Sequence, residues 1–175
     1  MKPPSKIKSA LNSGAMVGMG LMLLALITYV FEIYEQQWFG YLSWLVLVGG
    51  IVVGTKKYRD ESLGGYISYG SALGYGVLLS LFAAIVAGFV NYIYLSFIDD
   101  SFLLFLAETT ELEMYEKGMS DEEIEMAMGY SKMLMSATGI AFMGIFSTTI
   151  LGFIFSLVTS AFLKKESDLF EGEEQ

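Results

Sequence analysis

Charged and small residues that could hold a phosphate gather in one stretch, residues 56–76, with the sequence KKYRDESLGGYISYGSALGYG. A P-loop needs Gly-Lys-Ser/Thr after its glycines, and a dinucleotide-binding fingerprint needs a preceding strand. Neither feature is present here, and the glycines repeat at helical spacing instead. We therefore expect no nucleotide or other cofactor.

A second candidate for chemistry is residues 99–136, which hold ten acidic residues and two lysines. Carboxylates bind hard cations such as Ca²⁺, but SDEEIE at 120–125 lacks the alternating acids of an EF-hand. Acids in a first helical turn also stabilise the helix dipole. A soft metal such as Cu(I) is the alternative for the methionines here, yet they scatter over both helix faces, as packing residues do. We expect no metal site at these methionines: Met114, Met119, Met126, Met128, Met133 and Met135.

The residue types that most enzymes use as nucleophiles and bases are missing. The chain has no cysteine and no histidine, which excludes thiolate and imidazole metal ligands and the common nucleophile–base pairs. No predicted membrane segment pairs an inward serine with a lysine or a carboxylate. We therefore expect no catalytic residue and predict that the protein is not an enzyme.

The elements that carry these residues are strongly apolar. Hydrophobic residues make up 54% of the 175 and charged residues 17%, against about 25% charged in soluble domains. About 20 apolar residues cross a bilayer, and four segments approach or exceed that length, at about 14–34, 38–55, 66–98 and 137–163. We predict an all-α fold: one membrane domain, residues 1–165, built as a four-helix bundle, with a disordered acidic tail at 166–175.

Two of these segments have alternatives. The first follows Lys2, Lys6 and Lys8, as a signal peptide would, but no small-x-small cleavage site follows it. We read it as an uncleaved helix. The second is short and spans only if the residues before Tyr41 lie at membrane depth or the bilayer thins. We count it as a span because the charge pattern opposes an odd number of crossings.

The basic residues predict the orientation of the spans, since cytoplasmic loops are rich in lysine and arginine. Eight of the ten fall on one side of a four-span arrangement, which makes both termini cytoplasmic. Lys56, Lys57 and Arg59 would form a loop that fixes this topology or contacts lipid headgroups. The other side holds Lys117 and Lys132, in the acidic segment. We expect the partners to be the lipid bilayer and a second copy or another membrane protein, not nucleic acid.

Helix signals divide the external segment, about 99–135, into a hairpin of two helices. Asp99, Asp100 or Ser101 can begin the first helix, and Gly118 suits the position after its end. Ser120 and Glu123 form a capping box for the second helix. One stripe of that helix is apolar and leads towards the last span: Ile124, Ala127, Met128, Ser131, Leu134 and Met135.

Small residues recur every four positions along the third segment. Such residues let membrane helices approach closely, because lipid provides no hydrophobic force between helices. We predict a packing ridge within the bundle, with a homodimer face or a substrate groove as alternatives. The ridge consists of Gly64, Ser68, Ala72, Gly76, Ser80, Ala84 and Gly88. Matching small residues occur in the fourth segment at Gly144, Thr148, Gly152, Ser156 and Ser160.

The order of these features resembles a known family. KKYRDE is followed by LGGYISYGSAL, then NYIYLSFIDDSF, then an acidic KGMSDEEIE segment and a terminal LKK. This resembles DUF4199, a bacterial membrane family found mainly in Bacteroidota, over roughly Ser9 to Lys165. The resemblance implies four spans and an inner-membrane location, and it supplies no catalytic residues.

The functional prediction is a non-enzymatic scaffold or accessory subunit whose external hairpin meets a partner. A small transporter or channel component is the alternative. Ion-coupled transporters commonly carry ionisable residues or broken helices at the midplane, and no Asp, Glu, Lys or Arg lies near the middle of any predicted span. Asn91 is the strongest polar candidate, and we expect an interhelical hydrogen bond there.

Overall fold

The computed structural model describes residues 5–33, 36 and 38–165, and these residues form six α-helices. One isolated antiparallel bridge joins Ile67 to Lys165. Both prolines precede the first helix, so no helix interior contains a residue without a backbone N–H. The helices are α1 (Lys6–Val30), α2 (Trp38–Ser62), α3 (Tyr69–Phe97), α4 (Ser101–Glu116), α5 (Asp121–Leu134) and α6 (Ala137–Leu163).

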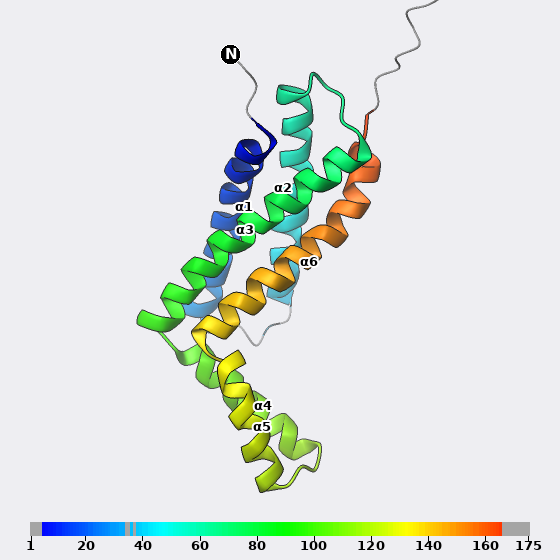
Figure 1. Ribbon diagram of the computed structural model, residues 1–175. Coiled ribbons are helices and arrows are strands. Elements are labelled where there is room, and N and C mark those ends of the chain that lie inside the picture. The colour runs from blue at the N-terminus through cyan, green and yellow to red at the C-terminus, as the bar shows by residue number, and fades with distance from the viewer. Residues whose placement is uncertain (1–4, 34–35, 37, 166–175) are drawn as a thin grey trace, which may run out of the picture.

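Four long helices form a bundle around α3 (Figure 1). α3 makes its most extensive contacts with α6 on one side and α1 on the other, and α2 packs against all three. The start of α1, the α2–α3 connection and the end of α6 lie at one end of the bundle. The hairpin of α4 and α5 projects from the opposite end (Figure 1).

Three of the long helices are long and apolar enough to cross a membrane. They are α1, α3 and α6, with 25, 29 and 27 residues and mean hydropathies of 1.9, 2.2 and 2.0. At about 1.5 Å of rise per residue, each exceeds the ~30 Å hydrocarbon thickness of a bilayer. Their outward faces carry large exposed side chains such as Leu23, Phe89 and Phe146. The chain is therefore that of a membrane protein.

The basic stretch is helical, which corrects the prediction that KKYRDE forms a loop. α2 runs without interruption through Lys56 and Arg59 to Ser62. Lysine, arginine and glutamate are good helix formers, so the helix continues after its apolar part ends at Thr55. α1 likewise begins at Lys6, earlier than its apolar part. A hydropathy pattern therefore shows which part of a helix is apolar enough to lie in a membrane, but it does not show where the helix begins or ends.

The turn before α3 corrects the predicted ridge at its first two positions. Gly64 and Gly65 have φ angles of +69° and +93°, a left-handed conformation that glycine adopts without a steric penalty. Ser68 is the N-cap of α3, and its hydroxyl accepts a hydrogen bond from the Ser71 N–H. Gly64 and Ser68 therefore form the turn and the cap, and the ridge begins at Ala72.

The helical hairpin forms where the sequence predicted it. Gly118 follows α4 with a φ of +77°, and Ser120 with Glu123 completes a capping box at the start of α5. Both signals are confirmed. α5 does not continue into α6, because Met135 and Ser136 separate the two helices and Ser136 caps α6. Gly139 lies so close to the carbonyls of Met133 and Leu134 that a Cβ there would overlap them.

An aromatic cluster connects the base of the hairpin to the bundle. Tyr29 of α1 stacks on Tyr94 of α3, with ring centroids 5.1 Å apart, and Phe102 of α4 lies 5.3 Å from Tyr29. Ala137 and Ile140 of α6 pack against the same cluster. This arrangement fixes the first turn of α4, while the rest of the hairpin extends beyond the bundle (Figure 1).

Candidate functional site

The α3–α6 seam is formed by two reciprocal glycine–serine contacts. Gly76 of α3 faces Ser156 of α6, and Ser80 of α3 faces Gly152 of α6. In each pair, a Cβ on the glycine would overlap the serine side chain of the other helix. The helices run antiparallel, so a small-xxx-small pair on each one meets its counterpart in reverse order. Gly88 extends the seam, since its Cβ would come within 2.7 Å of Ile145.

This seam lies inside the bundle. Ala72, Gly76, Ser80, Ala84 and Gly88 are all buried, as are Gly152, Ser156 and Ser160 across from them. Their placement favours packing within one chain over the alternative of a homodimer face. Gly144 differs from the other small residues of α6, because a Cβ there would meet nothing within 4 Å.

A second face of α3 meets glycines of α1. Gly14 lies against Leu79 and Phe82, with a Cβ position 2.6 Å from the Leu79 carbonyl oxygen. Gly18, one turn later, has a Cβ position 2.8 Å from the Ala83 carbonyl oxygen. The central helix is therefore held closely on two sides.

A buried tyrosine joins three helices at the end that carries both described chain ends. The hydroxyl of Tyr75 in α3 is 3.1 Å from the Ser9 hydroxyl and 3.0 Å from the Ser13 hydroxyl of α1. Its ring stacks on Tyr58 of α2, with centroids 4.5 Å apart and planes at 7°. Sequence reasoning missed this cluster, although serines four residues apart on one helix face are a readable signal.

Two further hydroxyl groups in the bundle are buried without a hydrogen-bond partner among the described residues. They are Thr55 Oγ1 in α2 and Ser156 Oγ in α6. Ser80 Oγ, in contrast, donates to the Gly76 carbonyl within its own helix at 2.9 Å. A buried hydroxyl without a hydrogen-bond partner destabilises the folded state. Thr55 and Ser156 are therefore polar positions of the interior that packing alone does not explain.

The cations at the basic end of the bundle are of two kinds: Arg59 contacts another helix, whereas Lys56 and Lys57 are exposed. Arg59 Nε lies 2.7 Å from Asp60 Oδ1, and Arg59 Nη1 donates to the Leu163 carbonyl at 3.2 Å. Its side chain is only 16% exposed. Arg59 thus joins α2 to the end of α6, while Lys56 and Lys57 are exposed and have no ion pair in the described part of the chain.

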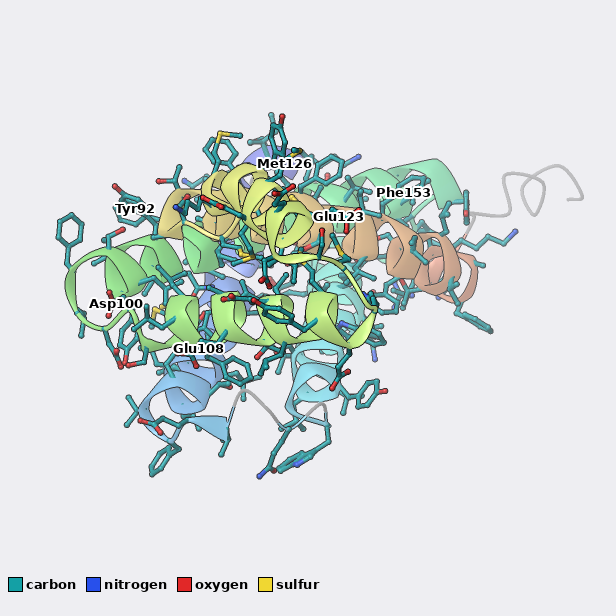
Figure 2. The ribbon with its side chains drawn as sticks, turned by 90° about the horizontal axis from the view of Figure 1, so that it is seen from below. Tyr92, Asp100, Glu108, Glu123, Met126 and Phe153 are labelled. Atoms are coloured by element: carbon teal, nitrogen blue, oxygen red, sulfur yellow. The ribbon has the colours of Figure 1, made fainter. Side chains whose placement is uncertain are left out.

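The hairpin presents exposed apolar side chains among its acids. Met126, Tyr130 and Met133 of α5 are 66%, 80% and 76% exposed. Viewed from the hairpin end, Met126 lies on the side of α5 away from α4, whereas Glu108 and Glu123 lie lower in the same view (Figure 2). Of the predicted apolar stripe, Ile124 is buried, but Leu134 is 51% exposed. The stripe therefore accounts for only part of the apolar surface.

Two carboxylates of the hairpin segment, those of Glu123 and Asp99, accept local hydrogen bonds. Glu123 accepts from the Ser120 N–H and hydroxyl, both at 2.9 Å. These bonds hold the pKa of Glu123 below its usual range. Asp99 accepts hydrogen bonds from the Ser101 hydroxyl at 2.6 Å and from the Ser101 N–H at 2.9 Å, and these bonds likewise lower the pKa of Asp99. Across the described residues, no three acidic side chains are placed to hold a metal ion.

The remaining polar candidate of the membrane segments lies at the hairpin end of α3. Asn91 lies beside the Tyr29 side chain of α1, next to the Tyr29–Tyr94 stack. This placement puts Asn91 where α1 meets α3, and the interhelical hydrogen bond expected there stays a prediction.

Comparison with known proteins tests the family. The family model described as "Protein of unknown function (DUF4199)" matches residues 12–165, which is most of the chain. The chain belongs to the DUF4199 family. No curated protein and no solved structure matches it. The match of this DUF4199 member covers all six helices except the first turns of α1, so the hairpin and the seam both lie within the family's common region.

Proposed function

We propose that this DUF4199 member is a four-span scaffold or accessory subunit of the bacterial inner membrane, without enzymatic activity. Its hairpin, α4 and α5, recruits a partner outside the membrane. The observation that carries this proposal is the exposed apolar surface of α5 within a segment of net charge −8. Exposed apolar patches rimmed by polar residues mark interaction sites.

The proposed fourth span is α2. It has 25 residues, about 38 Å at the usual rise, and no charge between Trp38 and Thr55. Leu47 and Ile51 are buried against the bundle, while Leu45 and Val53 are exposed, as lipid-facing residues would be. With four spans, the basic end of the bundle faces the cytoplasm and the hairpin lies outside.

The chemistry of the hairpin indicates what kind of partner fits. Its ten acidic residues outnumber its two lysines, and one of these, Lys117, already pairs with Glu113 at 3.6 Å. Such a surface repels other acidic surfaces and attracts basic ones. The exposed methionines and Tyr130 add adaptable apolar contact. We propose a partner segment that combines basic and apolar residues.

Photo-crosslinking in native membranes tests this proposal. A photoreactive amino acid at position 126 or 130 should give one discrete protein adduct, because both side chains are exposed on the hairpin. The matched control is position 153, since Phe153 is also exposed but lies in the apolar part of α6. It should give lipid adducts. Absence of protein adducts at 126 and 130, together with a monomer that co-purifies with nothing, would reject the scaffold proposal.

A small transporter or channel component is the second candidate. The hydroxyls of Thr55 and Ser156, which have no hydrogen-bond partner among the described residues, favour it, because polar groups inside a membrane bundle can serve a permeating solute. Solute flux into proteoliposomes that is lost in Thr55→Val would support transport. Equal leakage with and without the protein, across ions and small polar solutes, would remove this candidate.

A further inference from the structure

Three segments meet at the basic end of the bundle and bring lysines together from distant parts of the chain. Ile67 and Lys165 exchange backbone hydrogen bonds of 2.8 and 2.9 Å, which hold the residues after α6 beside the α2–α3 connection. Lys56 and Lys165 both lie near enough to Asp60 for their charges to act on it. Lys56 and Lys165, which are 109 positions apart in sequence, therefore lie close together at this end of the bundle.

The charges at this spot are unbalanced. Residues 56–61 and 164–165 contain five cations and two carboxylates, a net charge of +3. Arg59 is committed to Asp60 and to the Leu163 carbonyl. Lys56, Lys57, Lys164 and Lys165 are exposed and have no ion pair within the part of the chain that the structure describes. The free cations therefore lack an anion.

The surroundings of these lysines are those of a membrane interface. Lys165 Nζ lies over the Tyr66 ring, 5.4 Å from its centroid, and Tyr69 donates to the Leu157 carbonyl at 3.2 Å. Tyrosines of this kind lie at headgroup depth. Phe162, two residues before the lysine pair, is 84% exposed. An apolar surface thus continues directly from the cationic one, which suits a molecule with an anionic head and an acyl tail.

We propose that Lys56 and Lys165, with Lys57 and Lys164 beside them in sequence, bind the phosphate headgroup of an anionic phospholipid where α2 meets the end of α6, with its acyl chain along Phe162. This proposal rests on one part of the proposed function, that the protein is embedded in a membrane, and it does not depend on a partner of the hairpin. It differs from a general attraction of basic loops to membranes, because the site requires lysines of α2 and of the residues that follow α6, which Arg59 and the Ile67–Lys165 bridge hold together.

Native mass spectrometry of the full chain tests the site. After exchange into mixed phosphatidylglycerol and phosphatidylcholine, we expect preferential retention of phosphatidylglycerol. Each surface lysine contributes about fivefold in affinity for anionic lipid, so Lys56→Gln with Lys165→Gln should reduce retention roughly 25-fold. The control, Lys117→Gln with Lys132→Gln, removes the same charge from the hairpin and should leave retention unchanged.

Several outcomes would overturn the proposal. They are equal retention of both lipids, an equal loss in the control variant, or no loss in the Lys56/Lys165 variant. Displacement by millimolar inorganic phosphate would identify a free-anion site in place of a lipid site. Circular dichroism checks that both variants fold, and the single variant Lys56→Gln provides a milder test should the double variant unfold. Crosslinking at positions 126 and 130 should persist in the lysine variants, so failure here is separable from failure of the scaffold proposal.

Discussion

At the scale of single residues, Gly76 decides how closely α3 and α6 approach. Replacing Gly76 with alanine would drive a methyl group into Ser156 and to within 3.2 Å of Ile51. Overpacking of this kind costs about 1–3 kcal/mol, so we expect Gly76→Ala to lower the free energy of unfolding by that amount. Gly76→Leu should prevent folding. Denaturant titration in detergent micelles measures both.

Gly144 provides the control for that prediction, since a Cβ there meets open space. Alanine is favoured over glycine in a helix interior by up to about 1 kcal/mol. Gly144→Ala should therefore leave stability unchanged or raise it slightly. If both alanine variants behaved alike, the seam would not depend on close approach, and the packing role of the ridge would be wrong.

Tyr75 allows a second prediction at this scale. Tyr75→Phe keeps the stack on Tyr58 but removes the hydroxyl that contacts Ser9 and Ser13. Interhelical hydrogen bonds in membranes contribute about 0.6 kcal/mol each, so we expect a loss of about 1 kcal/mol in the free energy of unfolding. The same titration with Ser9→Ala/Ser13→Ala should give a similar loss, and the combined triple variant should add little to it. Full additivity would contradict a shared hydrogen-bond cluster.

At the scale of elements, the start of α5 depends on the capping box. Ser120→Ala removes a hydroxyl that bonds the Glu123 carboxylate and caps the helix, and the loss of such a cap costs about 1 kcal/mol. Because hydrogen bonds to Ser120 lower the pKa of Glu123, this variant should raise that pKa towards its ordinary value. Carbon-detected NMR titration of the Glu123 carboxyl measures the shift. Ser136→Ala, which removes the cap of α6, should not move it.

The sign of the pH effect follows from the same contact. A lowered pKa in the folded hairpin means that ionised Glu123 stabilises α5 above the ordinary glutamate pKa of about 4.3. This stabilisation is lost as the pH falls through the lower, folded value. Acidification from pH 5 to 3 should therefore loosen α5 in the parent protein, and Ser120→Ala should show less of this dependence. Amide exchange at residues 121–125 reports it.

The elements also show how far sequence reasoning reaches here. The hairpin was predictable because Gly118 and the Ser120–Glu123 pair are local signals, each read from a few residues. The ridge was predictable from Ala72 onward, since helical spacing persists there. Its extension to Gly64 failed because small residues at a four-residue spacing do not reveal where a left-handed turn interrupts the helix. The role of Arg59 was hidden because its partner, the Leu163 carbonyl, is distant in sequence.

At the scale of the whole molecule, charge is separated along the bundle. The basic end carries Lys6, Lys8 and the cluster around Lys56 and Lys165, while the hairpin at the other end carries a net charge of −8 (Figure 1). The helices between them have buried faces in which glycine, serine and alanine accompany large residues such as Tyr75 and Leu79, and outer faces of large apolar residues. This separation suits a protein that is held in one orientation and acts at its two ends.

The predicted orientation depends on how many times the chain crosses the membrane. Because the sequence contains no cysteine, single cysteines introduced by mutation can test that number. We predict that single cysteines at Lys57 and Gln36 react with a membrane-impermeant maleimide from opposite sides of sealed inner-membrane vesicles, because α2 crosses between them. Glu122→Cys should react from the same side as Gln36→Cys, since α3 crosses back. Lys57→Cys should react only from the cytoplasmic side, where lysine and arginine concentrate.

Reaction of positions 36 and 57 from the same side would mean that α2 lies on the membrane surface. The protein would then have three spans, and the hairpin and the N-terminus would face the same compartment.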